Sequence, residues 1–443
     1  MSIYKEGRCI MKIIKRKDIA DSEYKGLIYR YGDDFISTMV NTVVPIVNDV
    51  RKRGDEAVKD YTEKFDGMRP ASLLVSEEEI ENGYKSLTAE QIDAFRQAKE
   101  NIEEFHIHQK RHSLQYERGN DGVFGIMYQP IENAAVYVPG GKASYPSSVL
   151  MGVIPAKIAG VKHITLVTPS RRDGGISNAV LGVCKILDIT TILRSGGAQG
   201  IAAAGFGTES VKKADIIVGP GNVYVTAAKS YLFSLGVTQI DSMAGPSETL
   251  IIADESADPV WTAYDLLSQA EHEEHAKAVL VTTSETFAEK VKAEIEADLE
   301  KGAGRIDIKR KAVAENLTMI IVESIDQAIA FSNEYAPEHM QMMVKEPMQY
   351  LHSIRNVGSL FLGGYSPVAA GDYFSGTNHV LPTGGAARFS SGLSVETFLR
   401  RTTYQQLTAA GLGKAVNPVK LMSSLEGFDD MHGGSVRIRF EKK

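Results

Sequence analysis

Apolar residues recur at two different spacings along this chain, and the spacings predict where helices and strands form. Between residue 35 and about residue 112 they lie three and four positions apart, which is the period of a helix with one buried face. Thr88 and Gln91 stand where a capping box would begin one of these helices. We therefore expect a helical layer here that packs against another part of the protein.

Beyond this layer, short runs rich in β-branched residues alternate with helical segments rich in small residues. A first set of runs predicts strands at residues 134–138, 164–168, 190–194 and 215–219. A second set predicts strands at residues 249–254, 278–283, 318–322, 341–344 and 359–363. Strand, helix and strand in this order are typical of parallel sheets with crossover helices. The expected fold class is α/β, with two Rossmann-like parallel-sheet domains that lack the usual G-x-G-x-x-G dinucleotide fingerprint.

Composition shifts along the chain suggest its domain boundaries. Glycine- and proline-rich junctions at residues 137–141 and 243–248 bracket the first set of strands. From about residue 394 the pattern becomes polar and helical, and it ends in a short predicted strand, SVRIRF. The predicted domains are an N-terminal arm (1–34), one α/β domain (35–135 with 241–393), a second α/β domain (136–240) and a small C-terminal helical tail (394–443). Because the tail is too small to hold its own core, we expect it to dock on another domain or subunit.

The composition of the 443 residues narrows the function classes. Cys9 and Cys184 are the only cysteines, so neither a disulfide framework nor a cysteine zinc site is available, which favours a reducing, cytoplasmic location. A net charge of -7, with both signs interspersed, offers no basic stripe for nucleic acid and no polybasic membrane anchor. The chain also lacks the apolar run of ~18 residues that a membrane-spanning helix needs. We expect no nucleic acid and no membrane partner.

Gln269 and His272 lie three positions apart in a stretch of good helix formers, so both side chains can leave the same face of one helical turn. Spaced in this way they could chelate one metal ion, although a solvated polar helix face is the commoner reason for such a pair. The neighbouring segment from His272 to His275 does not match the zinc-protease motif, which needs its two histidines four positions apart rather than three.

Glu338 and His339 follow Pro337, which suits the first turn of a helix because proline lacks an N–H group. A carboxylate next to an imidazole at a helix N-terminus would place an acid and a base at one cleft. An imidazole near its usual pKa of about 6.5 is a competent proton acceptor. The alternative interpretation is a solvated helix cap without a catalytic role.

Residues 371–392 are denser in glycine than a simple connecting loop needs, which favours a functional loop. Asp372, Asn378 and His379 are the side chains that such a loop could present to a ligand. Two further glycine-rich segments, SGGAQG and GPGNVYVTAAK, each follow a predicted strand and lead into a helix. That arrangement directs backbone N–H groups and a helix N-terminus at an anion, and a dinucleotide is one of several candidates.

Taken in order, these segments and their neighbours resemble the histidinol dehydrogenase family. The resemblance extends from about Val43 to the final predicted strand. It rests on YVPGG with YPSSVLM and PAKIAG (137–160), GGAQGIAA (196–203), VGPGNVYVTAAK (218–229), DSMAGPSE (241–248), LLSQAEH (266–272), YAPEHM (335–340), GDYFSGTNHVLPTGG (371–385) and ARFSSGLSV (387–395).

The resemblance implies roles for the residues that match the family's motifs. Zinc, with manganese as a substitute, would be held by Gln269, His272, Asp372 and His432. The general acid and base would be Glu338 and His339. The substrate would contact Ser247, His379, Glu426 and His339 together with the four zinc ligands. NAD would contact Tyr137, Gln199 and Asn222, which assigns the cofactor to the domain at residues 136–240.

By the same resemblance, the reaction would be the NAD-linked oxidation of L-histidinol, a small amino alcohol, through bound L-histidinal to L-histidine. Two NAD would be used in turn. Zinc would orient the substrate while His339 takes the hydroxyl proton, and Glu338 would then activate water to hydrate the aldehyde. Family members are homodimers in which the C-terminal segment reaches the partner's active site, which fits a tail with too little core of its own.

One position departs from the family's pattern. The family usually has a substrate-binding glutamate five residues before the C-terminal zinc histidine, whereas Glu426 lies six residues before His432. A shift of one residue turns a side chain by about 100° on a helix. Either a local bulge restores the carboxylate, or Asp429 or Asp430 replaces it, or the substrate differs.

Two alternative functions therefore stand beside the oxidation of histidinol. One is a paralogue with the same machinery that oxidises another hydroxylated compound, such as a sulfonated propanediol. The other belongs to a different class and is a metal-dependent hydrolase or a non-catalytic metal-binding protein.

Overall fold

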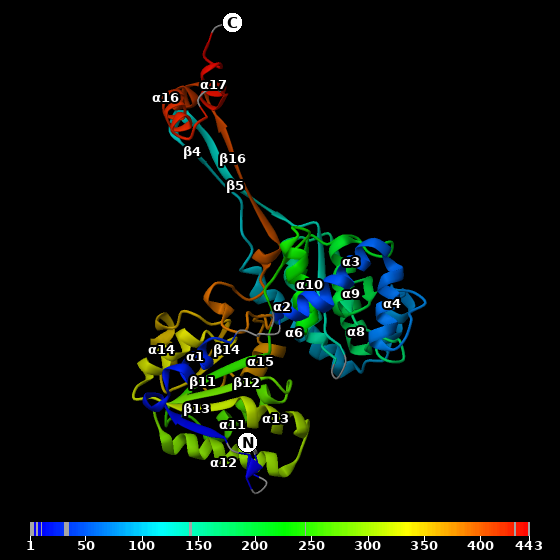
Figure 1. The fold of residues 1–443 in the computed structure, drawn as a ribbon, viewed down its shortest axis with the longest axis vertical. Helices are drawn as coiled ribbons and strands as arrows, with labels where there is room; N and C mark the ends of the chain where they lie inside the picture. Colours follow the sequence, from blue (N-terminus) through cyan, green and yellow to red (C-terminus); the bar gives the residue numbers. More distant parts are fainter. Residues whose placement is uncertain are drawn as a thin grey trace. The chain divides into compact units, whose positions relative to one another are not determined.

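The computed structural model describes residues 11–30, 35–140, 144–243, 245–428 and 431–441, and the backbone of two short strands, β1 (Tyr4–Lys5) and β2 (Arg8–Cys9). The chain separates into two compact units (Figure 1). The larger unit comprises Met1–Gln109 and Glu132–Phe398, and the C-terminal unit comprises Lys110–Ile131 and Leu399–Lys443. In the described part of the chain, no helix is both long enough and apolar enough to cross a membrane.

Six parallel strands form one sheet of the larger unit, in the order β15, β14, β11, β12, β13, β3 (Figure 1). They are β3 (Lys12–Lys15), β11 (Glu248–Ala253), β12 (Lys277–Thr282), β13 (Leu317–Ile321), β14 (His339–Met343) and β15 (Ser359–Leu362). Every residue of the central strand β11 is buried, as expected for a parallel strand with helices on both faces. One face packs on α11 (Pro259–Ala270), α12 (Glu285–Lys301) and α13 (Ile306–Asn316), and the other on α1 (Asp21–Ile28) and α14 (Ile325–Tyr335).

Five parallel strands form the second sheet of the larger unit, in the order β10, β9, β6, β7, β8. They are β6 (Asn133–Tyr137), β7 (His163–Thr168), β8 (Thr191–Arg194), β9 (Ile216–Val218) and β10 (Gln239–Ile240). The connecting helices are α7 (Pro146–Ala159), α8 (Asn178–Ile186), α9 (Gly197–Phe206) and α10 (Val223–Ser234). The predicted α/β fold with two parallel sheets is confirmed, and each of the nine strands predicted for these sheets lies within two residues of the observed one.

The predicted helical layer is present, but it covers a different sheet from the one expected. Its helices are α2 (Phe35–Thr38), a π-helical turn (Met39–Val43), α3 (Val44–Arg53), α4 (Asp55–Asp66), α5 (Glu77–Lys85) and α6 (Ala89–Ile107). The apolar faces of α3 and α4 share one core with α9 and the five-stranded sheet, and α5 packs on α8. Thr88 and Gln91 form the predicted capping box at the start of α6.

This packing corrects two predicted domain boundaries. Residues 35–85 belong with the five-stranded sheet rather than with residues 241–393, because helical periodicity marks a buried face without saying which sheet covers it. The described part of the predicted N-terminal arm is also no separate arm. It supplies the edge strand β3, which pairs in parallel with β13, and the helix α1, which packs on the same sheet.

The strand order reverses once in each sheet, and the candidate site residues lie near these two reversals. The reversal lies between β6 and β9 in the five-stranded sheet and between β11 and β14 in the six-stranded sheet. The carboxyl ends of parallel strands at such a point form a crevice that commonly binds ligands, and this applies to the five-stranded sheet. In the six-stranded sheet, Glu338 and His339 lie instead at the amino ends of β11 and β14. Gly219, just past β9, has a φ of +109°, and a Cβ there would lie 2.1 Å from the carbonyl oxygen of Tyr137. Only glycine allows this close approach between the ends of β9 and β6.

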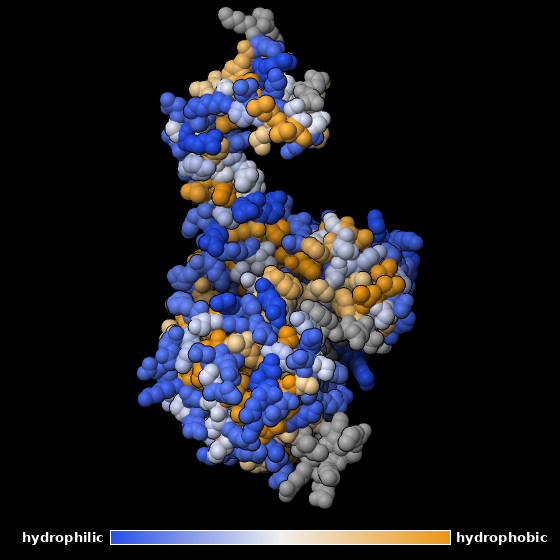
Figure 2. All heavy atoms as spheres, turned by 60° about the vertical axis from the view of Figure 1, so that its left-hand side comes forward, coloured by the Kyte–Doolittle hydropathy of each residue, from blue (hydrophilic) through white to orange (hydrophobic). Residues whose placement is uncertain are grey.

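The C-terminal unit consists of an antiparallel sheet in the order β16, β5, β4 and two helices. Its elements are β4 (Leu114–Glu117), β5 (Gly122–Pro130), β16 (Leu399–Leu407), α16 (Ala409–Leu425) and α17 (Met431–Arg437). Among the described residues of the two helices, only Ser423 and Gly433 are buried. Apolar side chains such as Leu425, which is 89% exposed, and Met431, which is 76% exposed, reach its surface. Figure 2 shows the hydropathy of the molecular surface from one side. The prediction that this tail holds little core is therefore confirmed for the described residues.

Two elements of the tail were predicted wrongly. The polar segment before residue 408 was expected to be helical, but it forms β16, which pairs with β5 from Leu399 opposite Pro130 to Leu407 opposite Gly122. No strand forms at SVRIRF: its first three residues end α17, which packs on α16, and its last three form a turn. Both outcomes depend on whether a partner strand is available, because a strand needs one for its backbone hydrogen bonds and a helix does not. β16 has such a partner in β5.

The remaining regular elements are short. They are the helix α15 (Val368–Tyr373) and 3₁₀ turns at Arg16–Asp18, Gly119–Asp121, Pro347–Ser353, Ala386–Arg388 and Val395–Phe398. Helix α15 begins the glycine-rich loop at residues 371–392, and the loop otherwise has little regular structure.

Candidate active site

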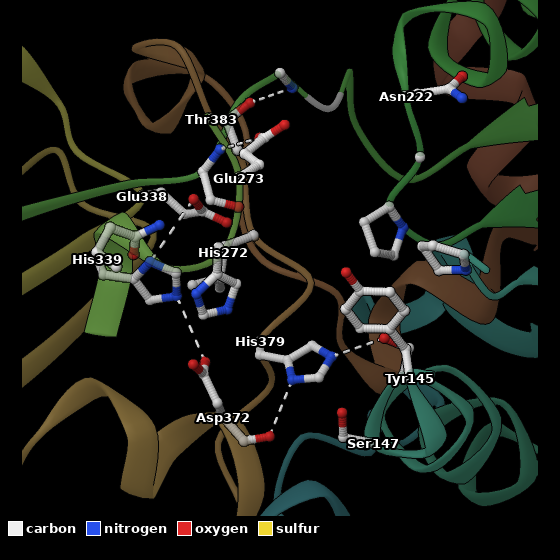
Figure 3. A pocket seen from close by; sticks show the side chains of 18 of the residues that line it. Tyr145, Ser147, Asn222, His272, Glu273, Glu338, His339, Asp372, His379 and Thr383 are labelled. Carbon is white, nitrogen blue, oxygen red and sulfur yellow. Dashed lines mark hydrogen bonds and ion pairs between the residues drawn. The ribbon is translucent and has the colours of Figure 1, made fainter. Parts of the chain in front are cut away.

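A pocket of about 260 Å³ lies in the larger unit and takes its lining from both sheets. Figure 3 shows Glu338, His339 and His272 on one side, and Asn222, Tyr145 and Ser147 on the other. The first side belongs to the region around the amino ends of β11 and β14. The second side belongs to the loop after β9 and to the start of α7.

His339 begins β14, and its ring is fixed with one nitrogen unpaired. Its Nδ1 lies 3.2 Å from the carbonyl oxygen of Glu248, and because a carbonyl only accepts, the proton of a neutral ring is on Nδ1. Nε2 is then a free acceptor, and it is buried without a hydrogen-bond partner in the described part of the chain. Burial lowers the pKa of His339, because the charged ring would lose its water. The structure therefore holds His339 as a neutral base.

Glu338 is a buried carboxyl group next to this imidazole. Its Oε2 accepts a hydrogen bond from the backbone N–H of Glu248, with an N···O distance of 2.9 Å. Burial raises the pKa of Glu338 well above its usual value, and the negative charges of Glu248 and Asp372 add to the rise. A carboxylate of raised pKa is a stronger proton acceptor than an ordinary glutamate. The alternative of a solvated helix cap is wrong, because Glu338 and His339 are only 5% and 6% exposed.

The helix predicted to begin at Pro337 is not formed. Helix α14 ends at Tyr335, Ala336 has a left-handed φ of 51°, and the chain enters β14 at His339. A residue before proline avoids the helical region, so Pro337 follows the end of a helix here rather than beginning one. The acid and base are therefore placed at the amino end of a strand that is paired on both sides, by β11 and β15.

Gln269, His272 and Asp372 line the same pocket. Gln269 lies in the last turn of α11, where it is buried and its Nε2 has no hydrogen-bond partner among the described residues. This burial contradicts the interpretation of the Gln269 and His272 pair as a solvated helix face. His272 Nδ1 lies 3.0 Å from the carbonyl oxygen of Ser268, which leaves Nε2 as the nitrogen with a free lone pair. Asp372 Oδ1 lies 3.7 Å from His339 Nε2.

These three side chains fit part of a zinc or manganese site. An amide oxygen, an imidazole nitrogen and a carboxylate oxygen are ligands that both ions accept. The buried amide of Gln269 lacks a partner, and a half-turn of the amide would present its oxygen instead. Across the described ranges, no group of three or more His, Cys, Asp or Glu side chains is arranged to hold a metal ion. Of the four predicted metal ligands, the pocket thus contains one imidazole, one carboxylate and one amide, and the fourth would have to come from elsewhere.

Ser247 and His379 also line this pocket. His379 Nδ1 lies 3.0 Å from the carbonyl oxygen of Asp372, and its Nε2 lies 3.3 Å from the hydroxyl oxygen of Ser148. Burial lowers the pKa of His379. Asn378, the third candidate of the glycine-rich loop, has a different place, because its amide donates to the carbonyl oxygen of Met151 at 2.8 Å. Asn378 therefore anchors the loop, and Asp372 and His379 face the pocket.

A second cavity, of about 420 Å³, lies at the carboxyl ends of the five-stranded sheet. All three predicted cofactor residues line it: Tyr137 ends β6, Gln199 lies in the first turn of α9, and Asn222 is the N-cap of α10. The two glycine-rich segments each join a strand to a helix there, as predicted. Asn222 lines both cavities, so the two lie next to each other.

Three buried oxygen atoms of this second cavity have no hydrogen-bond partner among the described residues. They are Asp66 Oδ2, Ser170 Oγ and Gln199 Oε1. Buried polar groups are normally paired, so the cavity has acceptors that a ligand with hydroxyl or amide donors would satisfy. Asp66 is the last residue of α4, and burial raises the pKa of its carboxyl group to about 6.

Replacing Asp66 with asparagine should stabilise the protein above pH 7. A carboxyl group whose pKa is higher in the folded state contributes stability at low pH, and this contribution is lost as the pH rises through about 6. One unit of pKa corresponds to about 1.4 kcal/mol, and because the side chain is only half-buried, solvent screening leaves a gain of about 1 to 2 kcal/mol for D66N.

Thermal unfolding of the wild type and D66N at pH 8 and pH 4 measures this effect. The variant should melt at a higher temperature at pH 8, and the difference should shrink at pH 4. Glu63→Gln is the matched control, because Glu63 lies exposed on the same helix. An equal or lower melting temperature for D66N at pH 8 would contradict the assignment of a raised pKa.

Three residues of the candidate site, Glu248, Asp66 and Tyr145, were not singled out by the sequence analysis. Glu248 is a buried charged residue at the start of β11, and its backbone holds both Glu338 and His339. Asp66 precedes the glycine that ends α4 and resembles an ordinary helix terminus. Tyr145 lies in the segment before α7 and lines the pocket. A buried charge inside an apolar strand, as at Glu248, is the one signal that could have been noticed.

Glu426 and His432 belong to the C-terminal unit, and their assignment to the site remains a prediction. Helix α16 ends at Leu425, Gly427 has a φ of +80°, and α17 begins at Met431. The altered spacing between Glu426 and His432 thus falls in a connection between helices, which can absorb one residue more easily than a helix can. Asp429 and Asp430, considered as replacements, lie outside the described residues.

Comparison with known proteins identifies the family. The sequence model of histidinol dehydrogenase matches residues 31–440. A histidinol dehydrogenase of Leptospira biflexa is 49% identical over 405 residues, which cover 91% of this chain and 93% of that protein. One of Methanocaldococcus jannaschii is 44% identical over 432 residues, which cover 97% and 99%. The crystal structure of histidinol dehydrogenase from Elizabethkingia anophelis matches with a TM-score of 0.89 and 39% identity, over 97% of each chain. The chain therefore belongs to the histidinol dehydrogenase family.

Proposed function

We propose that this protein oxidises L-histidinol through L-histidinal to L-histidine, the last steps of histidine biosynthesis, with NAD as the oxidant and zinc as the bound metal. The relatives named histidinol dehydrogenase support the substrate, since they cover nearly the whole chain. Manganese is the expected substitute for zinc, because the ligands contain oxygen and nitrogen and no thiolate.

The observation that carries the proposal is the state of His339. Its Nδ1–H is held by the Glu248 carbonyl, and its Nε2 is a buried acceptor without a partner among the described residues. The same pocket presents Gln269, His272 and Asp372. A base that is neutral, fixed and unpaired beside potential metal ligands is suited to take a proton from an alcohol.

In the first oxidation, His339 Nε2 accepts the proton of the substrate hydroxyl group. Gln269, His272, Asp372 and His432 are the proposed metal ligands, and zinc, when bound, supplies positive charge that orients the amino alcohol and favours loss of its proton. Ser247 and His379 line the same pocket, which supports their proposed contact with the substrate. Orientation by several such groups is what converts an encounter into a reactive arrangement.

In the second oxidation, Glu338 has the role of activating water. The aldehyde must be hydrated before a second hydride can leave, and hydration needs a base near the carbonyl carbon. Burial raises the pKa of Glu338, so its carboxylate accepts a proton from water more readily than an exposed glutamate would. Once His339 has released the first proton to solvent, its Nε2 takes the proton of the hydrate hydroxyl group while a second NAD would accept the hydride.

NAD is proposed to occupy the second cavity, where it would accept the hydride. Tyr137, Gln199 and Asn222 line that cavity, and Asp66, Ser170 and Gln199 offer unpaired acceptors to hydroxyl or amide groups of the cofactor. Asn222 lines both cavities, which suits a cofactor whose reactive end must reach the alcohol carbon.

We further propose a homodimer in which the C-terminal unit of one protomer supplies His432 and Glu426 to the site of its partner. Two observations support this arrangement. The pocket of the larger unit presents only part of a metal-ligand set, and the C-terminal unit exposes apolar residues such as Leu425 and Met431. Exposed apolar surface of this kind is typical of a protein interface.

A steady-state assay of the zinc-loaded enzyme tests the function. With L-histidinol and NAD we expect NADH formation with a kcat/KM on the order of 10⁴ M⁻¹ s⁻¹ or more. The same enzyme offered a sulfonated propanediol should turn over far more slowly. The reverse preference would favour the paralogue, and no binding of NAD in calorimetry at millimolar concentration would favour the metal-dependent hydrolase or the metal-binding protein.

A further inference from the structure

Arg30 and Glu248 form a fully buried ion pair behind the acid and base. Arg30 Nε and its second terminal nitrogen each lie 2.9 Å from one carboxylate oxygen of Glu248. The two side chains are 3% and 1% exposed. A guanidinium group and a carboxylate that meet through two parallel hydrogen bonds fix each other's orientation as well as their distance.

Glu248 is the residue that holds both proposed catalytic groups. Its backbone N–H donates to the Glu338 carboxylate at 2.9 Å, and its carbonyl oxygen lies 3.2 Å from His339 Nδ1. Its side chain accepts a further hydrogen bond from the backbone N–H of Gly384 at 3.1 Å, in the glycine-rich loop. A displacement of Glu248 would therefore move the hydrogen-bond partners of Glu338 and His339 together.

Arg30 also contacts Tyr335, which lies just before Glu338 and His339 in the sequence. The guanidinium carbon lies 3.6 Å from the centre of the Tyr335 ring, and one nitrogen donates to the Tyr335 carbonyl oxygen at 2.8 Å. Tyr335 ends α14, and the chain runs from it to Glu338 in three residues. The remaining terminal nitrogen donates to the carbonyl oxygens of Leu27 and Ile28, at the end of α1. Arg30 thus joins α1, the end of α14 and the start of β11.

We propose that Arg30 is a positioning residue for the oxidation: through Glu248 and Tyr335 it sets where His339 Nε2 and the Glu338 carboxylate stand in the pocket. This inference rests on the proposed function. Arg30 does not line the pocket, so it acts on the reaction only through the groups it holds. Lysine would keep the charge but lose the planar pair of donors and most of the contact with the Tyr335 ring.

The test compares Arg30→Gln and Arg30→Lys with wild type in the zinc-loaded enzyme, with kcat expressed per bound zinc. A displacement of a catalytic group by about 1 Å can lower the reaction rate by about 10²-fold. We expect R30Q to lower kcat by about that factor and R30K by about 10-fold, with the KM for L-histidinol and the zinc content close to wild type, because the proposed zinc ligands are not bonded to Arg30.

Arg16→Gln is the matched control. Arg16 belongs to the same N-terminal segment and stacks on Tyr24 at the same 3.6 Å, but its side chain does not contact Glu248. R16Q should keep the wild-type kcat. The double variant with Arg30→Gln and Glu248→Gln removes the unpaired buried charge, and if Arg30 acts through Glu248 its kcat should fall no further than that of the worse single variant.

A purely structural role would lower the melting temperature or the yield of R30Q and R30K while leaving kcat per zinc unchanged, and that result would overturn the proposal. If R30Q does not fold, R30K and the double variant decide in its place. A wild-type enzyme that does not oxidise L-histidinol would overturn the proposed function instead, so the two failures are distinguishable.

Discussion

Replacing His339 with asparagine should lower kcat for the oxidation of L-histidinol by about 10²- to 10⁴-fold, the usual contribution of a positioned general base. Asparagine can still donate a hydrogen bond to the Glu248 carbonyl, but it offers no basic nitrogen where Nε2 stands. Because His339 is not one of the proposed zinc ligands, the variant should keep its zinc. The measurement is kcat together with the zinc content of the purified protein.

The control for this variant is His352→Asn, which changes an exposed histidine that does not line the pocket. It should leave kcat unchanged. A His339→Asn enzyme that retains more than about a tenth of the wild-type kcat would contradict the role of general base, which is worth at least about 10²-fold. Loss of zinc together with activity would instead identify His339 as a metal ligand.

Replacing His272 with alanine should remove the metal. Three of the proposed ligands line this pocket: Gln269, His272 and Asp372. Without the His272 imidazole, the larger unit keeps only the two oxygen ligands of Gln269 and Asp372. Zinc favours nitrogen ligands, and we expect its content to fall below about 0.1 per protomer with a loss of oxidation. Zinc should raise the melting temperature of the wild type and leave that of the variant unchanged, because only bound ligand stabilises.

His275→Ala is the matched control for this experiment. His275 lies three residues further along the same segment, is exposed, and does not line the pocket. Its replacement should leave zinc content and kcat at wild-type values. An active, metal-free His272→Ala enzyme would contradict the proposed metal site, whereas zinc loss in both variants would favour a site built on the His272 to His275 segment.

The elements that depend on local patterns could be predicted from the sequence. Strands such as β11 read as continuous apolar runs, and the loops before α9 and α10 read as glycine-rich turns between a strand and a helix. The spacing of Gln269 and His272 also indicated that they could share one face and bind one ion, and both line the pocket. These features are set by neighbours in sequence, which a single sequence displays.

The features that were missed depend on distant neighbours. β16 forms a strand because β5 lies beside it. The chain after Pro337 forms the strand β14 because β11 and β15 pair with it on both sides. The side chain of Arg30 is fixed by an ion pair with the carboxylate of Glu248, which is 218 residues away in the sequence. Asp66 lines a cavity at the carboxyl ends of the five-stranded sheet, whose other lining residues come mostly from later in the chain. The roles assigned to Glu426 and His432 came from the resemblance to a family, because spacing alone does not relate them to the pocket.

The most direct test of the central claim is an end-point count with limiting L-histidinol and excess NAD on the zinc-loaded enzyme. One site that removes a hydride from the alcohol, hydrates the aldehyde and removes a second hydride predicts two NADH and one L-histidine for each L-histidinol consumed. One NADH with released aldehyde would contradict the role of Glu338 in hydration, and no NADH would contradict the proposed function itself.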